Sequence, residues 1–260
     1  ISEGGLMTFT VTRTGDAQVA QTVDFGTSIV AGSDTAEAVD FTGKSGTLSF
    51  AQGVTSQTFT VQTTIDDTYE GAETFTVSLS NATGGAVIGD GTGVGTIKDD
   101  GTGPGPFGPG PNADNDTPTV SIAVSPASIA ENAADGSVMT YTVSLSNKSD
   151  FDTVVTYTLS GSASAGDYAT TATGTVTIPA GSTTATFTVD PTDDALDEND
   201  ETVVATISSA ISNGAALTVT TASATGTILD NEGAPSFSVG DVSISEGGLM
   251  TFTVTRTGDA

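Results

Sequence analysis

The sequence of 260 residues contains no cysteine, no histidine and no tryptophan, and only five lysine or arginine residues. Without cysteine, disulfides and thiolate metal sites are excluded. Without histidine, Ser–His–Asp triads and imidazole metal ligands are excluded too. No apolar run approaches the roughly 20 residues that a membrane-spanning helix needs, so we expect no membrane span in this fragment.

The abundant charge is acidic: 32 Asp and Glu residues give a formal net charge of -27. Such a surface repels nucleic acid and anionic membranes, so we expect neither as a partner. Disordered acidic tails also carry such a charge. Val, Ile, Phe and Thr nevertheless recur in alternating runs throughout this chain, which favours a folded protein. The negative charges of a folded chain this acidic repel one another, and bound cations are the simplest way to reduce that repulsion.

Repetition is the most specific feature of the sequence. Residues Ile1–Ala17, ISEGGLMTFTVTRTGDA, recur letter for letter at Ile244–Ala260, an offset of 243 residues. A weaker repeat lies inside this period, because MTFTVT (Met7–Thr12) parallels MTYTVS (Met139–Ser144) and GTIKDD (Gly95–Asp100) parallels GTILDN (Gly226–Asn231). The fragment is therefore about one period of a longer tandem array, and each period holds two related domains.

The domain boundaries follow from the repeat spacing. We predict a first domain at residues 1–100, a linker at 101–117, a second domain at 118–233, and the first two strands of the next repeat at 234–260. The segment Gly101–Pro111 has five Gly and four Pro residues and is the expected hinge. The shorter junction Asp230–Pro235 is expected to be stiffer.

Period-two alternation predicts short β-strands and no helix. In the first domain the expected strands lie in 7–13, 19–25, 46–50, 59–63, 75–79 and 94–98. Met7, Phe9 and Val11 point to one face, and the Thr residues between them suit a face exposed to water. The pattern predicts an all-β chain of two-sheet sandwiches with about seven strands each.

The first domain lacks an opening strand that its relatives within the chain possess. The second domain has one at Thr119–Ser125, and the third copy has one at Ser236–Ser243. Residues 235–260 supply only two strands, which cannot bury a core alone. Either the array continues beyond this fragment, or this end completes the open domain of a neighbouring chain.

Strand parity predicts where the acidic residues gather. If successive strands of a sandwich alternate in direction, every second loop lies at the same pole. In the first domain that pole holds, among others, Glu3, Asp40, Asp66, Glu70 and Asp99. Equivalent acids occupy the same pole of the second domain, and this pole leads into the next domain.

Carboxylates gathered at one pole point to Ca²⁺. Ca²⁺ takes 6–8 oxygen ligands in flexible geometry, whereas Mg²⁺ demands a tighter octahedral shell. Zinc and copper would be expected to use His or Cys, which are absent. A solvated acidic surface is the alternative, but four converging loops, repeated in two domains, favour metal.

The order SEGG, a VDF or GDY step, DDxYEGAET and GTIxDD resembles the Calx-beta domain over both domains, almost from end to end. DDTYEGAETFTVSLSN (Asp66–Asn81) is its most specific part. That family includes regulatory calcium-binding domains of sodium–calcium exchangers and repeats of large bacterial surface proteins. The resemblance implies immunoglobulin-like sandwiches joined in tandem, with Ca²⁺ in apical loops at the carboxy-terminal end.

The resemblance also implies the metal ligands, position by position. In the first domain they are Glu3, Asp40, Asp66, Asp67, Glu70, Glu73, Asp99 and Asp100. In the second domain and the following copy they are Glu131, Asp167, Asp193, Asp194, Asp197, Glu198, Glu201, Asp230, Glu232 and Glu246. The second acidic turn has one extra residue, so Asp193, Asp194 and Asp197 compete for two places. The terminal acidic pair becomes Asp230–Asn231, for which Glu232 is the candidate replacement, and we expect fewer or weaker sites there.

Three functions remain to be compared. Paired carboxylates run glycoside hydrolysis, but no aromatic platform for sugar accompanies them, so we expect no enzyme and no catalytic residue. The favoured function is a calcium-binding structural repeat of a secreted, extracellular or cell-surface fibre or adhesin, in which Ca²⁺ stiffens the domain junctions. Its partners would be neighbouring repeats of the same array or neighbouring subunits of a fibre. The alternative is an extracellular module that binds carbohydrate or a partner directly.

Overall fold

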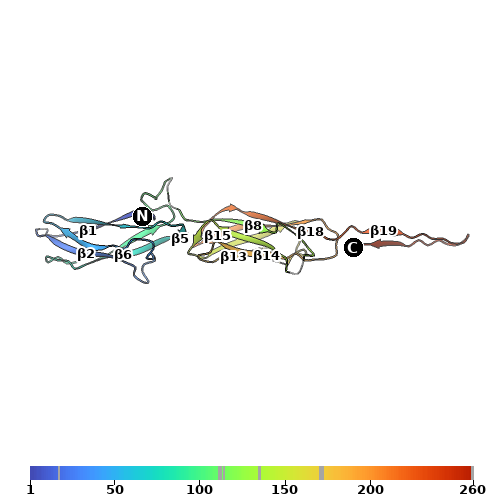
Figure 1. Ribbon diagram of the computed structural model, residues 1–260, viewed down its shortest axis with the longest axis horizontal. Coiled ribbons are helices and arrows are strands. Elements are labelled where there is room, and N and C mark those ends of the chain that lie inside the picture. Colours follow the sequence, from blue (N-terminus) through green and yellow to red (C-terminus); the bar gives the residue numbers. More distant parts are fainter. Residues whose placement is uncertain (17, 111–112, 114, 134–135, 170–172, 259–260) are drawn as a thin grey trace. The chain divides into compact units, whose positions relative to one another are not determined.

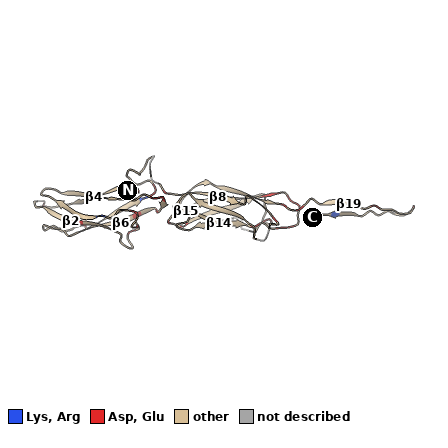
Figure 2. Cartoon of the chain, viewed as in Figure 1, with Lys and Arg blue, Asp and Glu red and all other residues tan. Residues whose placement is uncertain are grey.

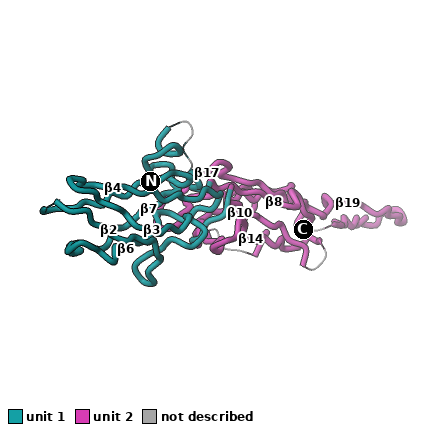
Figure 3. Tube along the Cα trace, turned by 60° about the vertical axis from the view of Figure 1, so that its left-hand side comes forward, with its two compact units in different colours: residues 1–118, 147–151 teal, residues 119–146, 152–260 magenta. Residues whose placement is uncertain are grey.

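The computed structural model describes residues 1–16, 18–110, 113, 115–133, 136–169 and 173–258. These residues form twenty β-strands and no helix, which confirms the predicted all-β class, and no helix among them could cross a membrane. The chain divides into two compact units (Figure 3). Unit 1 comprises residues 1–118 and 147–151, and unit 2 comprises residues 119–146 and 152–260.

Unit 1 is a sandwich of two antiparallel sheets (Figure 1). One sheet has four strands in the order β3-β2-β6-β7, and the other has only two, β1 and β4. A short parallel pair joins β5 to β11. The strands of this unit are β1 (Leu6–Thr12), β2 (Gln21–Ser28), β3 (Ser45–Phe50), β4 (Ser56–Gln62), β5 (Thr68–Tyr69), β6 (Ala72–Ser80), β7 (Thr92–Lys98) and β11 (Lys148–Ser149).

Unit 2 repeats this plan with fuller sheets. One sheet has the order β14-β10-β8-β17, and the other has six strands, with β16 paired to β15 beside the order β13-β12-β15-β18-β9. An antiparallel pair, β19 and β20, follows. The strands are β8 (Thr119–Ser125), β9 (Ser128–Ala130), β10 (Met139–Leu145), β12 (Thr153–Gly161), β13 (Thr173–Ile178), β14 (Thr184–Val189), β15 (Glu201–Ser212), β16 (Ala215–Ala216), β17 (Thr218–Thr221), β18 (Ser223–Leu229), β19 (Ser236–Val239) and β20 (Val254–Thr257).

A stack of three aromatic rings lies in the core of each unit. In unit 1, Phe59 stacks on Phe25 at 3.9 Å and on Phe9 at 5.3 Å between ring centroids. In unit 2 the ring at the equivalent position, Phe187, stacks between two tyrosines at 3.8 and 5.1 Å. Such rings dominate the energetics of burial in a small core. The weaker internal repeat is therefore a structural repeat as well.

One glycine in each unit makes room for this core. A Cβ on Gly95 of β7 would lie 2.5 Å from the Phe75 ring and 2.8 Å from the Met7 sulfur. A Cβ on Gly226 of β18 would lie 2.4 Å from the Met139 sulfur. Both glycines belong to the repeated GTI motif, so the motif is explained by close packing of the two sheets.

The segment after β7 packs against the start of the chain. Ser2 donates a hydrogen bond from its hydroxyl to the carbonyl of Gly103 at 2.8 Å, and its N–H binds the carbonyl of Pro104. Gly103 and Gly108 are buried. The predicted linker 101–117 thus has an ordered first half, whereas Pro111, the last residue of the expected hinge, lies outside the described residues.

Loops rich in acid gather toward one end of each unit (Figure 2). In unit 1 these are the β2–β3 loop with Asp40, the turn around β5 with Asp66 and Glu70, and the residues after β7 with Asp99. The antiparallel register of β6 with β7 places Glu73 directly opposite Ile97, next to that end. The strands therefore carry residues far apart in sequence to one pole.

Candidate metal centre

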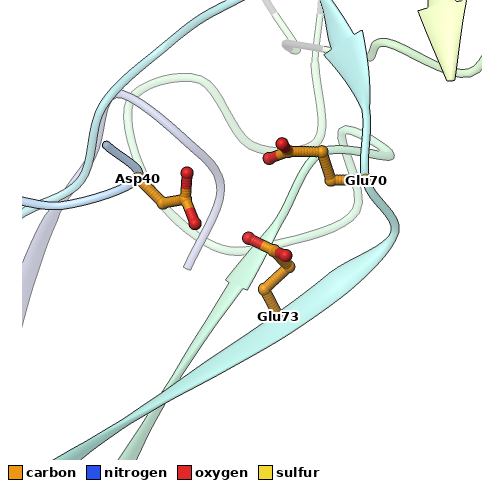
Figure 4. A group of neighbouring side chains, drawn as sticks. All are labelled: Asp40, Glu70 and Glu73. Carbon is orange, nitrogen blue, oxygen red and sulfur yellow. The ribbon is translucent and has the colours of Figure 1, made fainter. Parts of the chain in front are cut away.

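Three carboxylates of unit 1 converge on one point. Asp40, Glu70 and Glu73 each offer an oxygen, and these oxygens lie within 4.8 Å of one another (Figure 4). Asp40 comes from the β2–β3 loop and is buried, and its carboxylate accepts a hydrogen bond from the Glu37 N–H. Glu70 and Glu73 come from the turn after β5 and the start of β6.

The carboxylates of this triad repel one another when no counter-charge is bound. Burial raises the pKa of Glu73 to about 9, helped by its hydrogen bond to Asp40 and by the surrounding acids. Burial and the neighbouring Asp40 and Asp66 raise the pKa of Glu70 to about 7. Two carboxylates that share a hydrogen bond must hold a proton between them. A divalent cation would replace that proton with a stronger counter-charge.

A second acidic group lies beside the triad, around Glu3 and Asp99. Both are buried, with exposed fractions of 5% and 1%. Asp99 accepts N–H hydrogen bonds from Glu70 and Gly71, whereas its Oδ1 is buried with no hydrogen-bond partner among the described residues. Burial and the acids Asp66, Asp116 and Asp99 raise the pKa of Glu3 to about 8, although the Asp66 N–H opposes this.

Unit 2 contains the equivalent triad. Asp167, Glu198 and Glu201 correspond to the three acids of unit 1 and again place oxygens within 4.8 Å of one another. Burial raises the pKa of Glu201 to about 7, as does its hydrogen bond to Asp167. Glu198 is exposed here, so this triad is more open to water. The recurrence of the geometry in two units is the main sign that it is more than a charged surface.

A further group in unit 2 joins two segments of the chain. Glu131 after β9 meets Asp230 and Glu232 after β18, with oxygens within 4.8 Å of one another. Glu131 Oε1, Asp230 Oδ1 and Glu232 Oε2 are buried without a hydrogen-bond partner among the described residues. Burial and the contact with Glu232 raise the pKa of Glu131 to about 7.

These groups fit Ca²⁺ in the chemistry of their donors. Ca²⁺–oxygen distances of about 2.3–2.6 Å allow two ligand oxygens of one ion to lie up to roughly 5 Å apart. All donor atoms are carboxylate oxygens, and several are buried without a proton donor, which is costly unless a cation binds them. Backbone carbonyls and water would complete the shell of 6–8 ligands.

The remaining predicted ligands lie outside the three groups. Asp66, Asp67, Asp193, Asp194, Asp197 and Glu246 are exposed, and Asp100 is partly buried. Asp100 accepts hydrogen bonds from the N–H and hydroxyl of Thr102, and Asp194 accepts one from the Leu196 N–H. Asp193 lines a small polar cavity of about 270 Å³ together with Glu131. Asp193, Asp194 and Asp197 were predicted to compete for two ligand positions. None of them belongs to the triad of Asp167, Glu198 and Glu201.

Asp116 is a buried acid that was not among the ligands predicted from the sequence. This residue is 8% exposed, its N–H donates to the Asp99 carbonyl at 2.8 Å, and its charge helps to raise the pKa of Glu3. A sequence signal for it exists, because an acid shortly precedes Pro118 just as Glu232 shortly precedes Pro235. The Gly/Pro composition of the segment before it favoured assignment to the linker.

The Calx-beta domain model matches residues 2–98 and 113–232. This chain belongs to the Calx-beta family. The match covers both predicted domains and most of the chain, so the resemblance carried by the SEGG and DDxYEGAET motifs is confirmed. The tandem β-sandwich fold is confirmed with it. Calx-beta domains are binding and regulatory modules. That the chain is not an enzyme stays a prediction.

Solved structures similar to the chain include domains named Calx and CALX1. The apo-form Calx CBD1 domain is 30% identical, with 37% of this chain and 83% of that chain covered and a TM-score of 0.34. The calcium-binding domain CBD12 of CALX1.1 is 16% identical, with 89% and 95% covered and a TM-score of 0.37. CBD12 from CALX1.2 is 18% identical, with 83% and 78% covered and a TM-score of 0.36. No curated protein matches the chain.

Proposed function

We propose that this chain is a calcium-binding structural repeat of a secreted or cell-surface fibre or adhesin, in which Ca²⁺ stiffens the domain junctions. The recurrence of one carboxylate triad in both units carries the calcium part: Asp40, Glu70 and Glu73 in unit 1 match Asp167, Glu198 and Glu201 in unit 2. The three acids keep this arrangement although the acidic turn of unit 2 is one residue longer than that of unit 1. Binding of the same ion in both units would account for it.

The stiffening part is supported by where the acids sit along the chain. Asp230 and Glu232 lie between β18 and β19, in the segment that leads from the sandwich of unit 2 to the β19–β20 pair, and they meet Glu131 near the start of the same unit. An ion bound there would fix the exit of the chain to the body of the unit. In unit 1, Asp116 close before β8 lies near Glu3 and Asp99 and would act in the same way.

The proposed role in a fibre or adhesin is supported by the tandem repeat. The 17 identical residues at both ends of the period indicate an array that gains length by copying. The high negative charge suits a surface-exposed protein that remains soluble at millimolar calcium. These features favour an extended spacer and an extracellular location, where calcium of that concentration is available.

A calcium titration of the 260-residue chain tests this proposal. Extracellular modules bind Ca²⁺ with a Kd of about 10⁻⁴–10⁻³ M. At ten to one hundred times Kd, mass action stabilises the folded chain by about 1.4–2.7 kcal/mol per site. We expect the melting temperature to rise in Ca²⁺ relative to EDTA, and small-angle scattering to show a narrower distribution of dimensions.

Two controls make the titration specific. Asp90→Asn removes an acid of the opposite pole and should leave the response to calcium unchanged. Glu73→Gln and Glu201→Gln remove a ligand from each triad, and each should weaken one class of sites. Identical melting curves in Ca²⁺ and EDTA would refute a structural calcium site. If calcium raises the melting temperature but leaves the scattering profile unchanged, the proposed stiffening of the junctions would be refuted, whereas calcium binding would stand.

A further inference from the structure

Unit 1 repeats two of the three acids of a group that is complete in unit 2. In unit 2 the group is Glu131, Asp230 and Glu232. The N–H of Glu131 donates to the Leu229 carbonyl at 3.1 Å, and the N–H of Glu3 donates to the Lys98 carbonyl at 3.2 Å. Each of these carbonyls precedes the aspartate that follows the repeated GTI motif. Glu3 and Asp99 are therefore the counterparts of Glu131 and Asp230.

The third acid has no counterpart at the equivalent place in unit 1. Glu232 comes two residues after Asp230, whereas Gly101 comes two residues after Asp99. Gly101 has a φ of 68°, in the left-handed region that glycine adopts far more readily than glutamate. The backbone of unit 1 thus turns away where unit 2 supplies its third carboxylate.

Asp116 brings an acid back to this place after the Gly/Pro-rich segment. Its N–H donates to the Asp99 carbonyl at 2.8 Å, and Asn115 forms a β-bridge with Asp100. Asp116 is itself buried. Burial raises the pKa of Glu3 to about 8, and the charge of Asp116 contributes to this rise. The chain therefore returns beside the aspartate that it left, with a buried carboxylate near Glu3.

The described part of the segment between these two points folds back on unit 1. A Cβ on Gly4 would lie 2.9 Å from the Phe107 ring, so this ring packs directly over Gly4. The N–H of Gly108 donates to the Gly105 carbonyl at 3.1 Å. A Cβ on Gly108 would lie 2.0 Å from the carbonyl oxygen of Gly103, so the segment also turns back on itself. It forms a loop there and not an extended spacer.

Asp99 gives the independent sign that a cation belongs beside these acids. Its Oδ2 accepts the N–H groups of Glu70 and Gly71, whereas its Oδ1 is buried with no hydrogen-bond partner among the described residues. The same oxygen of Asp230 is in the same state. A buried carboxylate oxygen without a donor is costly unless a cation binds it. The side chain of Asp99 is 1% exposed, so water does not remove this cost.

We propose that Asp116 joins Glu3 and Asp99 as a calcium ligand, and that the bound ion closes residues 101–115 into a loop that the connection to β8 bypasses. Two residues, Thr117 and Pro118, then separate the ligand from β8. Three residues, 233–235, separate Glu232 from β19. Both junctions thus have nearly the same length when calcium is bound. This inference rests on the proposed calcium function and assigns to it a ligand and a calcium-dependent linker.

The linker becomes much longer when the loop opens in the absence of calcium. Nineteen residues, 100–118, lie between Asp99 and β8. A flexible glycine-rich chain of that length spans roughly 24 Å on average. Two residues span about 7 Å at most. Calcium therefore shortens the free part of the linker about threefold.

Cleavage by chymotrypsin after Phe107 measures whether the loop is closed. With calcium at ten to one hundred times Kd, this cleavage should be about ten to a hundred times slower than in EDTA, because it requires the loop to open. Asp116→Asn should remove the effect of calcium. Asp90→Asn, which changes an acid of the opposite pole, is the matched control and should keep it. Calcium that does not slow this cleavage, or slows it equally in Asp116→Asn, overturns the proposal.

The melting temperature in EDTA separates a ligand from a structural residue. Asp116→Asn keeps the backbone bond to the Asp99 carbonyl and removes one of several acids that repel one another. Its melting temperature in EDTA should equal or exceed that of the parent chain, whereas its calcium affinity at one class of sites should fall about tenfold to a hundredfold. A melting temperature that falls equally in EDTA and in calcium would show that Asp116 only supports the fold.

Insertions test the bypass. The residues Gly-Ser-Gly-Ser, inserted after Gly110, lengthen the closed loop, whereas the same residues inserted after Thr117 lengthen the junction itself. In calcium the first variant should give the small-angle scattering profile of the parent chain, and the second should show a broader distribution of dimensions. Equal broadening in both variants overturns the bypass.

Failure of this inference is distinguishable from failure of the proposed function. If calcium raises the melting temperature of the parent chain and of Asp116→Asn by the same amount, Asp116 is not a ligand and the calcium function stands. If calcium leaves the melting temperature of the parent chain unchanged, the calcium function itself is refuted.

Discussion

Calcium binding to the triad of unit 1 should depend steeply on pH. The pKa of Glu70 is raised to about 7 and that of Glu73 to about 9, so both carboxyls bind protons at a pH where ordinary glutamates are ionised. Ca²⁺ requires ionised ligands and must displace these protons. Calcium affinity therefore increases with pH until each displaced group is already ionised in the free chain.

The size of this effect follows from the two pKa values. Below its pKa, each displaced proton changes the apparent Kd tenfold per pH unit. Between about pH 6 and about pH 8, Glu73 contributes roughly two factors of ten and Glu70 roughly one, an upper limit of about a thousandfold. Water that reaches the partly exposed Glu70 screens its neighbours, which reduces the expectation to about a hundredfold.

Isothermal titration calorimetry in two buffers of different ionisation enthalpy measures both quantities. The affinity is expected to rise with pH, and at about pH 6 one to two protons should be released for each ion bound in unit 1. Glu73→Gln should weaken binding at high pH and flatten the pH dependence, whereas Asp90→Asn should change neither. A Kd that is constant over this range, with no proton release, would show that the raised carboxyls are not the ligands.

Two further outcomes concern the chain without calcium. In EDTA the free energy of unfolding should fall as pH rises from about 4.5 towards 9. The pKa values of Glu3, Glu73 and Glu131 are raised in the folded state, so the folded state holds more protons than the unfolded state in that window. Urea titrations at several pH values measure this, and a stability that increases over the same window would contradict it. Gly95→Ala should cost about 1–3 kcal/mol in a urea titration, because its Cβ would overlap the Phe75 ring. Gly93→Ala on the same strand has open space and should be nearly neutral, so equal losses from both variants would contradict the packing account.

The strands were predictable where side chains alternate strictly. The expected strand at Thr119–Ser125 coincides with β8, and the expected Gly46–Phe50 falls within β3. The strand expected at Val19–Phe25 instead runs over Gln21–Ser28. Arg13 binds the Val19 carbonyl at 2.9 Å, and pairing with β6 extends the strand to Ser28. Strand ends are set by such partners, which local alternation does not specify.

The pole at which the acidic groups lie was predictable, but the membership of each group was not. Strand parity brings loops to one end, yet it does not say which side chains meet there. Glu198 joins Asp167 and Glu201, whereas the neighbouring Asp197 belongs to none of the three groups found among the described residues. Asp116 was missed for a related reason, because burial of a linker residue depends on contacts that its local sequence does not reveal.

The duplicated segment distinguishes the effect of local sequence on structure from the effect of the surrounding tertiary structure. Residues 1–16 and 244–259 have the same sequence, yet Leu6–Thr12 forms a seven-residue strand paired with β4, whereas within the described part of the copy, 244–258, the strand is Val254–Thr257. Glu3 is 5% exposed with a pKa raised to about 8, while its copy Glu246 is exposed and joins no acidic group among the described residues. The letters are identical, so the difference arises from the sheets that surround one segment and not the other. A carboxylate of this repeat becomes a candidate calcium ligand only when its sandwich has formed, which ties metal binding to the completion of each unit.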